Sequence, residues 1–129
     1  MNIKDIDSLT LTVTDINHSV RFYHEVFDLP IIKDAKRPSL RLGHHRLEFR
    51  TKDDGAKIAA HVVTPGSAEI ALETHDPLEN TLSHLTNYAV EIDNGPIPYE
   101  GAKGVATALW VRDPDHNLIK IITLSLIHI

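Results

Sequence analysis

The feature that most constrains the fold is a strand–helix pattern that occurs twice along the chain. In the first copy, residues 7–14 alternate between apolar and small polar side chains, as in a strand with one buried face. Asp15 follows as a good N-cap, and apolar residues at helical spacing continue until Leu29-Pro30. This stretch predicts a strand followed by an amphipathic helix.

The second copy lies 61 residues further on, which is the distance from Asp15 to Asp76. Residues 68–72 again alternate, and Asp76 is predicted to cap a helix that has Pro77 at its first position. The same offset carries Ser8 to Glu69. An internal repeat with strand–helix openings is therefore predicted.

Each half continues with further strand candidates, so each half is predicted to be a βαβββ unit of an α+β fold. The candidates are residues 31–33, 39–42 and 46–50 in the first half, and 89–92, 106–112 and 118–124 in the second. We expect one domain, residues 1–129, built from repeat units 1–52 and 66–125. The linker 53–65 is rich in turn signals, and its middle, residues 57–63, is expected to form a short strand or helix.

Composition narrows the class of partner. Hydrophobic residues make up 42% and charged residues 24% of the chain, which is typical of a globular protein. The net charge of −5 argues against nucleic-acid binding, and the absence of cysteine leaves only His, Asp and Glu as metal ligands. No apolar run approaches the length of a membrane span, and the first residues do not resemble a signal peptide. We therefore expect a cytoplasmic protein, not bound to a membrane, whose partner is a small molecule.

Three stretches, in this order, carry a resemblance to a known family. They are residues 6–13 with Asp15, residues 21–23 with 27–29, and residues 111–119, which follow the family motif F-x-D-P-D-G-N-x-I-E with His116 in place of the glycine. Together they span most of the chain, which resembles the vicinal-oxygen-chelate superfamily of glyoxalases, bleomycin-resistance proteins and extradiol dioxygenases. The resemblance implies two βαβββ modules that form an open, cup-shaped mixed sheet with helices on the convex face. It also implies a homodimer.

The resemblance further implies a divalent metal in the cup, such as zinc, nickel, manganese or iron, held at four positions. These fall on Ser8, Glu48, Glu69 and Lys120 in this sequence. Glu48 and Glu69 are suitable ligands. Ser8 replaces the usual His and Lys120 the usual Glu, and a lysine would repel the ion. No cofactor is therefore expected, with a divalent metal as the alternative.

Alternation along the strands agrees with these positions. Ser8, Glu48 and Glu69 each lie opposite apolar neighbours, so all three side chains should point into the cup if the apolar faces meet the helices. Lys120 shares a strand face with apolar residues, and a charge in such a place requires a partner. We expect that partner to be Glu48 or Glu69.

Other residues are candidates for ligand binding. Arg46 and Arg50 share one strand face and could clamp an anionic group, or could lie on a solvated strand. His61 in the linker is a candidate acid–base group or stray ligand. Trp110 and Tyr99 are candidates for stacking on a ring, or are core residues.

These residues support two main functions. The first is a metal-free binding module of the bleomycin-resistance type, with Ser8, Arg46, Arg50, His61 and Trp110 in contact with the ligand. The alternative is a metal-dependent glyoxalase-like lyase, isomerase or dioxygenase that uses Glu48 and Glu69, with Lys120 as a third catalytic candidate. A partner-binding domain without chemistry is a further reading. The apolar tail, residues 123–129, is expected to extend the last strand, pack at a dimer interface or be foreign to the native sequence.

Overall fold

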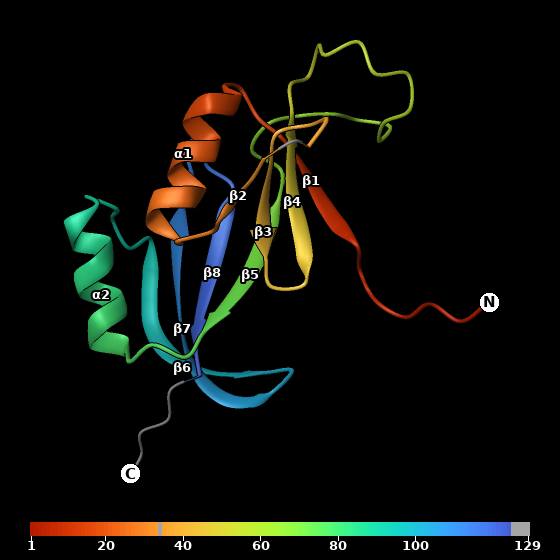
Figure 1. Cartoon of the computed structure of the whole chain (residues 1–129). Coiled ribbons are helices and arrows are strands. Elements are labelled where there is room, and N and C mark those ends of the chain that lie inside the picture. Colours follow the sequence, from red (N-terminus) through yellow and green to blue (C-terminus); the bar gives the residue numbers. More distant parts are fainter. Residues whose placement is uncertain (34, 125–129) are drawn as a thin grey trace. The chain divides into compact units, whose positions relative to one another are not determined.

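The chain folds into two compact units that divide between Ser67 and Ala68, in a computed structural model that describes residues 1–33 and 35–124. Each unit contains four strands and one helix in the order βαβββ (Figure 1). We call them the first and second modules. The predicted α+β class and the two βαβββ units are confirmed.

The first module is a mixed sheet with strand order β1-β4-β3-β2, in which β1 runs parallel to β4 and the other pairs are antiparallel. Asp15 caps the helix as predicted, and its carboxylate accepts a hydrogen bond from the His18 backbone N–H at 3.0 Å. The elements are β1 (Ser8–Thr12), α1 (Ile16–Val26), β2 (Ile31–Ile32), β3 (Ser39–Leu42) and β4 (His45–Arg50).

The second module repeats this topology with strand order β5-β8-β7-β6, and again only the outer first strand pairs in parallel, β5 with β8. Its elements are β5 (Glu69–Thr74), α2 (Leu78–Asn87), β6 (Asn94–Gly101), β7 (Gly104–Arg112) and β8 (Leu118–Thr123).

The prediction of a strand at residues 89–92 is wrong. Ala89 has a positive φ of 57°, and the Val90 backbone N–H bonds to the Leu85 carbonyl, so these residues form the turn that follows α2. The strand begins at Asn94 instead and includes Pro96 and Pro98. Prolines lack the N–H that a ladder needs, but β6 is an edge strand, where they are tolerated.

Two smaller expectations also require correction. Pro77, with φ −59° and ψ 150°, is itself the cap residue of α2 and provides no side-chain hydrogen bond, so Asp76 is not the cap. Residues 57–63 form neither the strand nor the helix expected of them. Of the apolar tail, Thr123 ends β8, while residues 125–129 lie outside the described part.

The cores follow the alternation of the sequence. In the first module, Tyr23 of α1 and Phe49 of β4 are fully buried, with ring centres 5.7 Å apart. In the second, Ile119 and Ile121 of β8 are buried, whereas Lys120 between them is half-buried and faces the other way. No helix in the described part of the chain is long and apolar enough to cross a bilayer.

A polar network fixes the turn between β7 and β8. The Asp113 carboxylate accepts hydrogen bonds from the backbone N–H groups of Asp115 and Asn117 and from the Asn117 side-chain amide, at 2.8 to 2.9 Å. The Asn117 side-chain oxygen then accepts from the Ala68 backbone N–H at 2.9 Å, just before β5. This turn therefore ties the start of β5 to the hairpin of β7 and β8.

His116 in this turn has a positive φ of 66°, a conformation that costs a residue with a Cβ about 1–2 kcal/mol. We expect His116→Gly to raise the free energy of unfolding by about 0.5–1 kcal/mol, because glycine removes this cost but loses more chain entropy. Urea denaturation of both proteins measures the difference. A His116→Ala variant, which keeps a Cβ, should show no such gain, and equal stabilisation by alanine would contradict the explanation.

Candidate functional site

Polar side chains gather on one face of the first module, which we call the Glu48 face. In the parallel pair, Ser8 lies beside Arg46, Thr10 beside Glu48, and Thr12 beside Arg50. The alternate residues of these strands, such as Leu47 and Phe49, are buried in the core. The prediction that Ser8, Glu48 and both arginines share a face is confirmed by this register.

The two arginines on the Glu48 face differ in their availability. Arg50 is buried and its Nη2 donates to Asp54 Oδ1 at 2.8 Å, so its guanidinium already has a carboxylate partner. Arg46 is 40% exposed and lies 4.0 Å from Glu48. An ion pair of this length near the surface is weak, so Arg46 is the more available cation.

The second module has a corresponding face, which we call the Lys120 face. Lys120 of β8 is the register partner of Ala71 on β5 and of Trp110 on β7. Lys120 and Glu48 occupy equivalent places in the two modules, because each pairs with the third residue of the outer parallel strand. Trp110 is half-buried directly beside the lysine.

The partner of Lys120 within the second module is Tyr99. Lys120 Nζ donates to the Tyr99 hydroxyl at 2.8 Å and lies 4.3 Å from the centre of the ring. Strand β7 separates β8 from β6, so the tyrosine must reach across it. The residues of β7 on this face between Tyr99 and Lys120 are small, Ala106 and Ala108.

The predicted ion pair between Lys120 and Glu69 is absent from the described residues of this module. Glu69 is exposed, and its register partner is Leu118. The lysine side chain extends toward β6 instead, where a hydroxyl and an aromatic ring surround its ammonium group.

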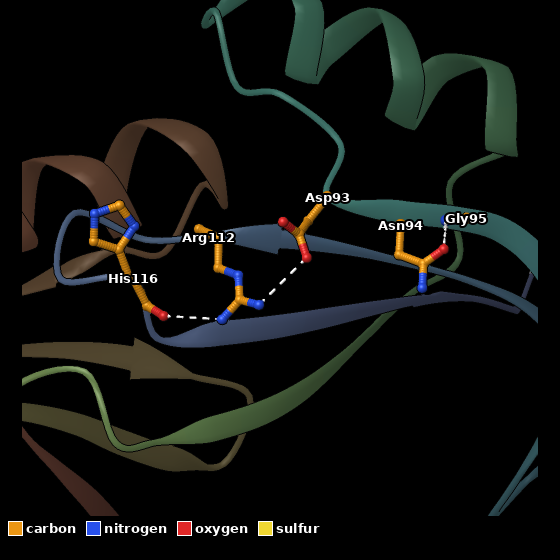
Figure 2. Close-up of polar contacts among 5 residues, drawn as sticks. All are labelled: Asp93, Asn94, Gly95, Arg112 and His116. Carbon is orange, nitrogen blue, oxygen red and sulfur yellow. Dashed lines mark hydrogen bonds and ion pairs between the residues drawn. The ribbon is translucent and has the colours of Figure 1, made fainter.

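Residues 68–124 contain three lysine or arginine side chains, and Lys120 differs from the other two in its partner. Lys103 pairs with Glu73 at 2.9 Å, and Arg112 pairs with Asp93 at 3.3 Å. Figure 2 shows Arg112 held on both sides, by Asp93 and by the His116 carbonyl at 3.2 Å. Lys120 is therefore the one cation in this stretch with no carboxylate partner.

A pocket of about 250 Å³ is lined by Tyr99, the hydrogen-bond partner of this lysine, while Lys120 itself is not part of the lining. The tip of the hairpin between β6 and β7 bends out of the line of its strands (Figure 1), and the Lys103–Glu73 ion pair joins it to β5. A Cβ on Gly101 would lie 2.6 Å from the Tyr99 ring, so glycine leaves space for that ring. The pocket is lined by Ala71, Glu73, Tyr99, Gly101, Ala102, Lys103, Gly104, Ile122 and Leu124.

The remaining candidates lie within their own modules. His61 is exposed on the segment between β4 and β5. Among residues 1–33 and 35–124, no three His, Asp or Glu side chains are grouped so that they could hold a metal ion. The roles predicted for Ser8, Glu48, Glu69 and His61 stay predictions.

The comparison with protein families agrees with this topology. The model of the Glyoxalase/Bleomycin resistance protein/Dioxygenase superfamily matches residues 5–121. The chain belongs to this superfamily. The resemblance read from the motifs at residues 6–13 and 111–119 is thus confirmed.

Several proteins are similar to this one over nearly the whole chain. Virulence protein STM3117 of Salmonella typhimurium is 34% identical over 122 residues, which are 94% of this chain and 85% of that protein. Its crystal structure has a TM-score of 0.88 and covers 95% of this chain and 98% of its own. An integron cassette protein from the mobile metagenome of V. cholerae has a TM-score of 0.90 at 32% identity, covering 97% and 98%. TnmS3 from Streptomyces sp. CB03234, at 19% identity and TM-score 0.76 over 95% and 98%, shares the fold.

Proposed function

We propose that this superfamily member binds a small molecule without a metal ion, on the Lys120 face of the second module. The observation that carries the proposal is the pair formed by Lys120 and Tyr99. The Lys120 ammonium group has no carboxylate partner among residues 68–124, and Tyr99 lines a pocket. A cation that is half-buried without a counter-charge favours an anionic or strongly polar ligand group.

The residues at the four family ligand positions do not fit a divalent ion well. Glu48 and Glu69 could each donate a carboxylate oxygen, but Ser8 offers a neutral hydroxyl. At the fourth position, the Lys120 ammonium group bonds to Tyr99 at 2.8 Å. A positive charge at a ligand position repels a metal cation, so we assign that position to ligand binding and not to metal binding.

The fold suits a binding protein. TnmS3, which shares it, is described as an antibiotic-binding protein. The alternative, a metal-dependent lyase, isomerase or dioxygenase, rests on Glu48 and Glu69, and the exposed carboxylate of Glu69 is the observation that favours it. Fold alone does not decide between them, because function depends on the site. The homodimer also stays a prediction.

The test is a ligand screen on protein treated with EDTA, read by the thermal midpoint and by tryptophan fluorescence. Trp110 is the single tryptophan of the chain and is the register partner of Lys120, so its emission reports on this face. We expect ligands that raise the midpoint by several degrees in EDTA, and we expect Lys120→Met to lose this effect. Lys57→Met, at an exposed lysine of the linker, is the matched control and should keep it.

Metal analysis tests the alternative in the same preparation. After incubation with zinc, nickel, manganese or iron(II) and removal of the excess, we expect well below one equivalent of bound metal. Near-stoichiometric metal that is lost on Glu48→Ala or Glu69→Ala would overturn the metal-free proposal and favour the enzyme.

A further inference from the structure

The pocket of the second module is small and has mainly apolar walls. Alanine and glycine residues, Ile122, Leu124 and the Tyr99 ring form most of its lining. A volume of about 250 Å³ equals the space of roughly eight water molecules in the liquid. It therefore fits an apolar body of about eight non-hydrogen atoms, smaller than a drug-sized ligand.

Charges near the pocket are unevenly distributed. Glu73 and Lys103 belong to the lining and largely neutralise each other at 2.9 Å. Lys120 is not part of the lining, but its register partner Ala71 and its hydrogen-bond partner Tyr99 both are. Two residues of the lining thus adjoin a cation that no carboxylate neutralises in the described part of this module.

Lys120 and Tyr99 both retain hydrogen-bonding capacity. An ammonium group has three donors, and one of them is used on the tyrosine. Because the Tyr99 oxygen accepts that bond, its own O–H is directed elsewhere and can donate. Two neighbouring donors, one of them charged, suit the two oxygens of a carboxylate.

Resting on the proposed function, we infer that the ligand is a small amphipathic monocarboxylate. Its carboxylate accepts hydrogen bonds from Lys120 and Tyr99, and its apolar body fills the pocket between β5 and the β6–β7 hairpin. Lys103 is the charged donor in the pocket lining, and it already pairs with Glu73. The remaining walls are mainly apolar, so a second carboxylate on the ligand would be buried without a partner, which selects against dicarboxylates of the same length.

The experiment compares four probes of equal chain length by Trp110 fluorescence: hexanoate, hexanamide, hexylammonium and the dicarboxylate adipate. We expect hexanoate to bind at least tenfold more tightly than each of the others, because only hexanoate combines one carboxylate with an apolar end. Thermal midpoints measured with the same probes give a second readout.

Variants distinguish the contribution of the carboxylate-binding pair, Lys120 and Tyr99, from that of the apolar pocket. Lys120→Met should weaken hexanoate binding at least tenfold and Tyr99→Phe about three- to tenfold, whereas Lys57→Met should change nothing. Ala71→Leu, at an exposed residue of the lining, should weaken hexanoate at least tenfold while acetate binding is unchanged, because only the longer chain needs the pocket. Thermal unfolding without ligand shows that each variant is folded.

Two outcomes would overturn the inference in different ways. If the screen yields ligands that depend on Lys120 but are neutral, cationic or dicarboxylic, with hexanoate no better than hexanamide, the monocarboxylate inference fails and the proposed function survives. If no compound binds in a way that depends on Lys120, both fail. Hexanoate binding that is unchanged in Lys120→Met and Ala71→Leu would also overturn the inference, since binding would then occur elsewhere.

Discussion

Gly95→Ala is expected to lower the free energy of unfolding by about 3 kcal/mol. Gly95 has a φ of +85°, a conformation that costs a residue with a Cβ about 1–2 kcal/mol. The new Cβ would also lie 2.7 Å from the Ala108 carbonyl oxygen and 3.0 Å from the Leu109 Cα. Both are backbone atoms of the buried part of β7, which cannot rotate away, and overpacking of this kind costs about 1–3 kcal/mol. Urea denaturation measures the loss.

The matched control is Gly55→Ala. Gly55 has a similar φ of +79°, but a Cβ there would meet no atom within 4 Å. Its substitution should therefore cost only the conformational part, about 1 kcal/mol. If both variants lose the same stability, the contact between Gly95 and β7 has no energetic role and the prediction is wrong.

Asp113→Ala is expected to cost about 3 kcal/mol or more. The Asp113 carboxylate is 4% exposed and accepts three hydrogen bonds, two of them from Asn117, which is 1% exposed. Removing it leaves buried donors without an acceptor, and each such donor costs about 1–3 kcal/mol. The loss should also reach β5, because Asn117 holds the Ala68 backbone N–H.

Hydrogen exchange and urea denaturation together test this prediction. We expect faster exchange of the Ala68 and Leu118 amides in Asp113→Ala, beyond the global change in stability. The control is Asp53→Ala, at an exposed aspartate on the segment between β4 and β5. Its free energy of unfolding should stay within about 0.5 kcal/mol of that of the parent protein. A loss below 1 kcal/mol in Asp113→Ala would show that the turn does not depend on this network.

Strand alternation predicted the faces of the sheets correctly because a period of two leaves little freedom. Leu47 and Phe49 enter the core, so Glu48 between them must leave it, and the same holds for Lys120 between Ile119 and Ile121. The start of α1 is equally well predicted by Asp15, whose side chain forms the expected cap.

The partner of Lys120 could not be obtained in the same way. The sequence pattern does not put Tyr99 on a strand, because the two prolines of β6 disguise that strand and the pattern favours residues 89–92 instead. Charge patterning also predicts only partners of opposite charge. A hydroxyl and an aromatic ring, reached across the small side chains of β7, meet the same need, and neither follows from charge patterning.

The strand order of the modules has a consequence for how the chain is made. Within the sheet that the described residues of each module form, the first strand pairs with the last one and with no other, β1 with β4 and β5 with β8. During synthesis, each opening strand must therefore wait, with its backbone groups unpaired, until the closing strand has left the ribosome. The helix and the hairpin between them can form early from local contacts, but the parallel pair needs contacts that are distant in sequence. The slow step of folding should thus occur once in each module, and chaperones would meet β1 and β5 as exposed edges in the nascent chain.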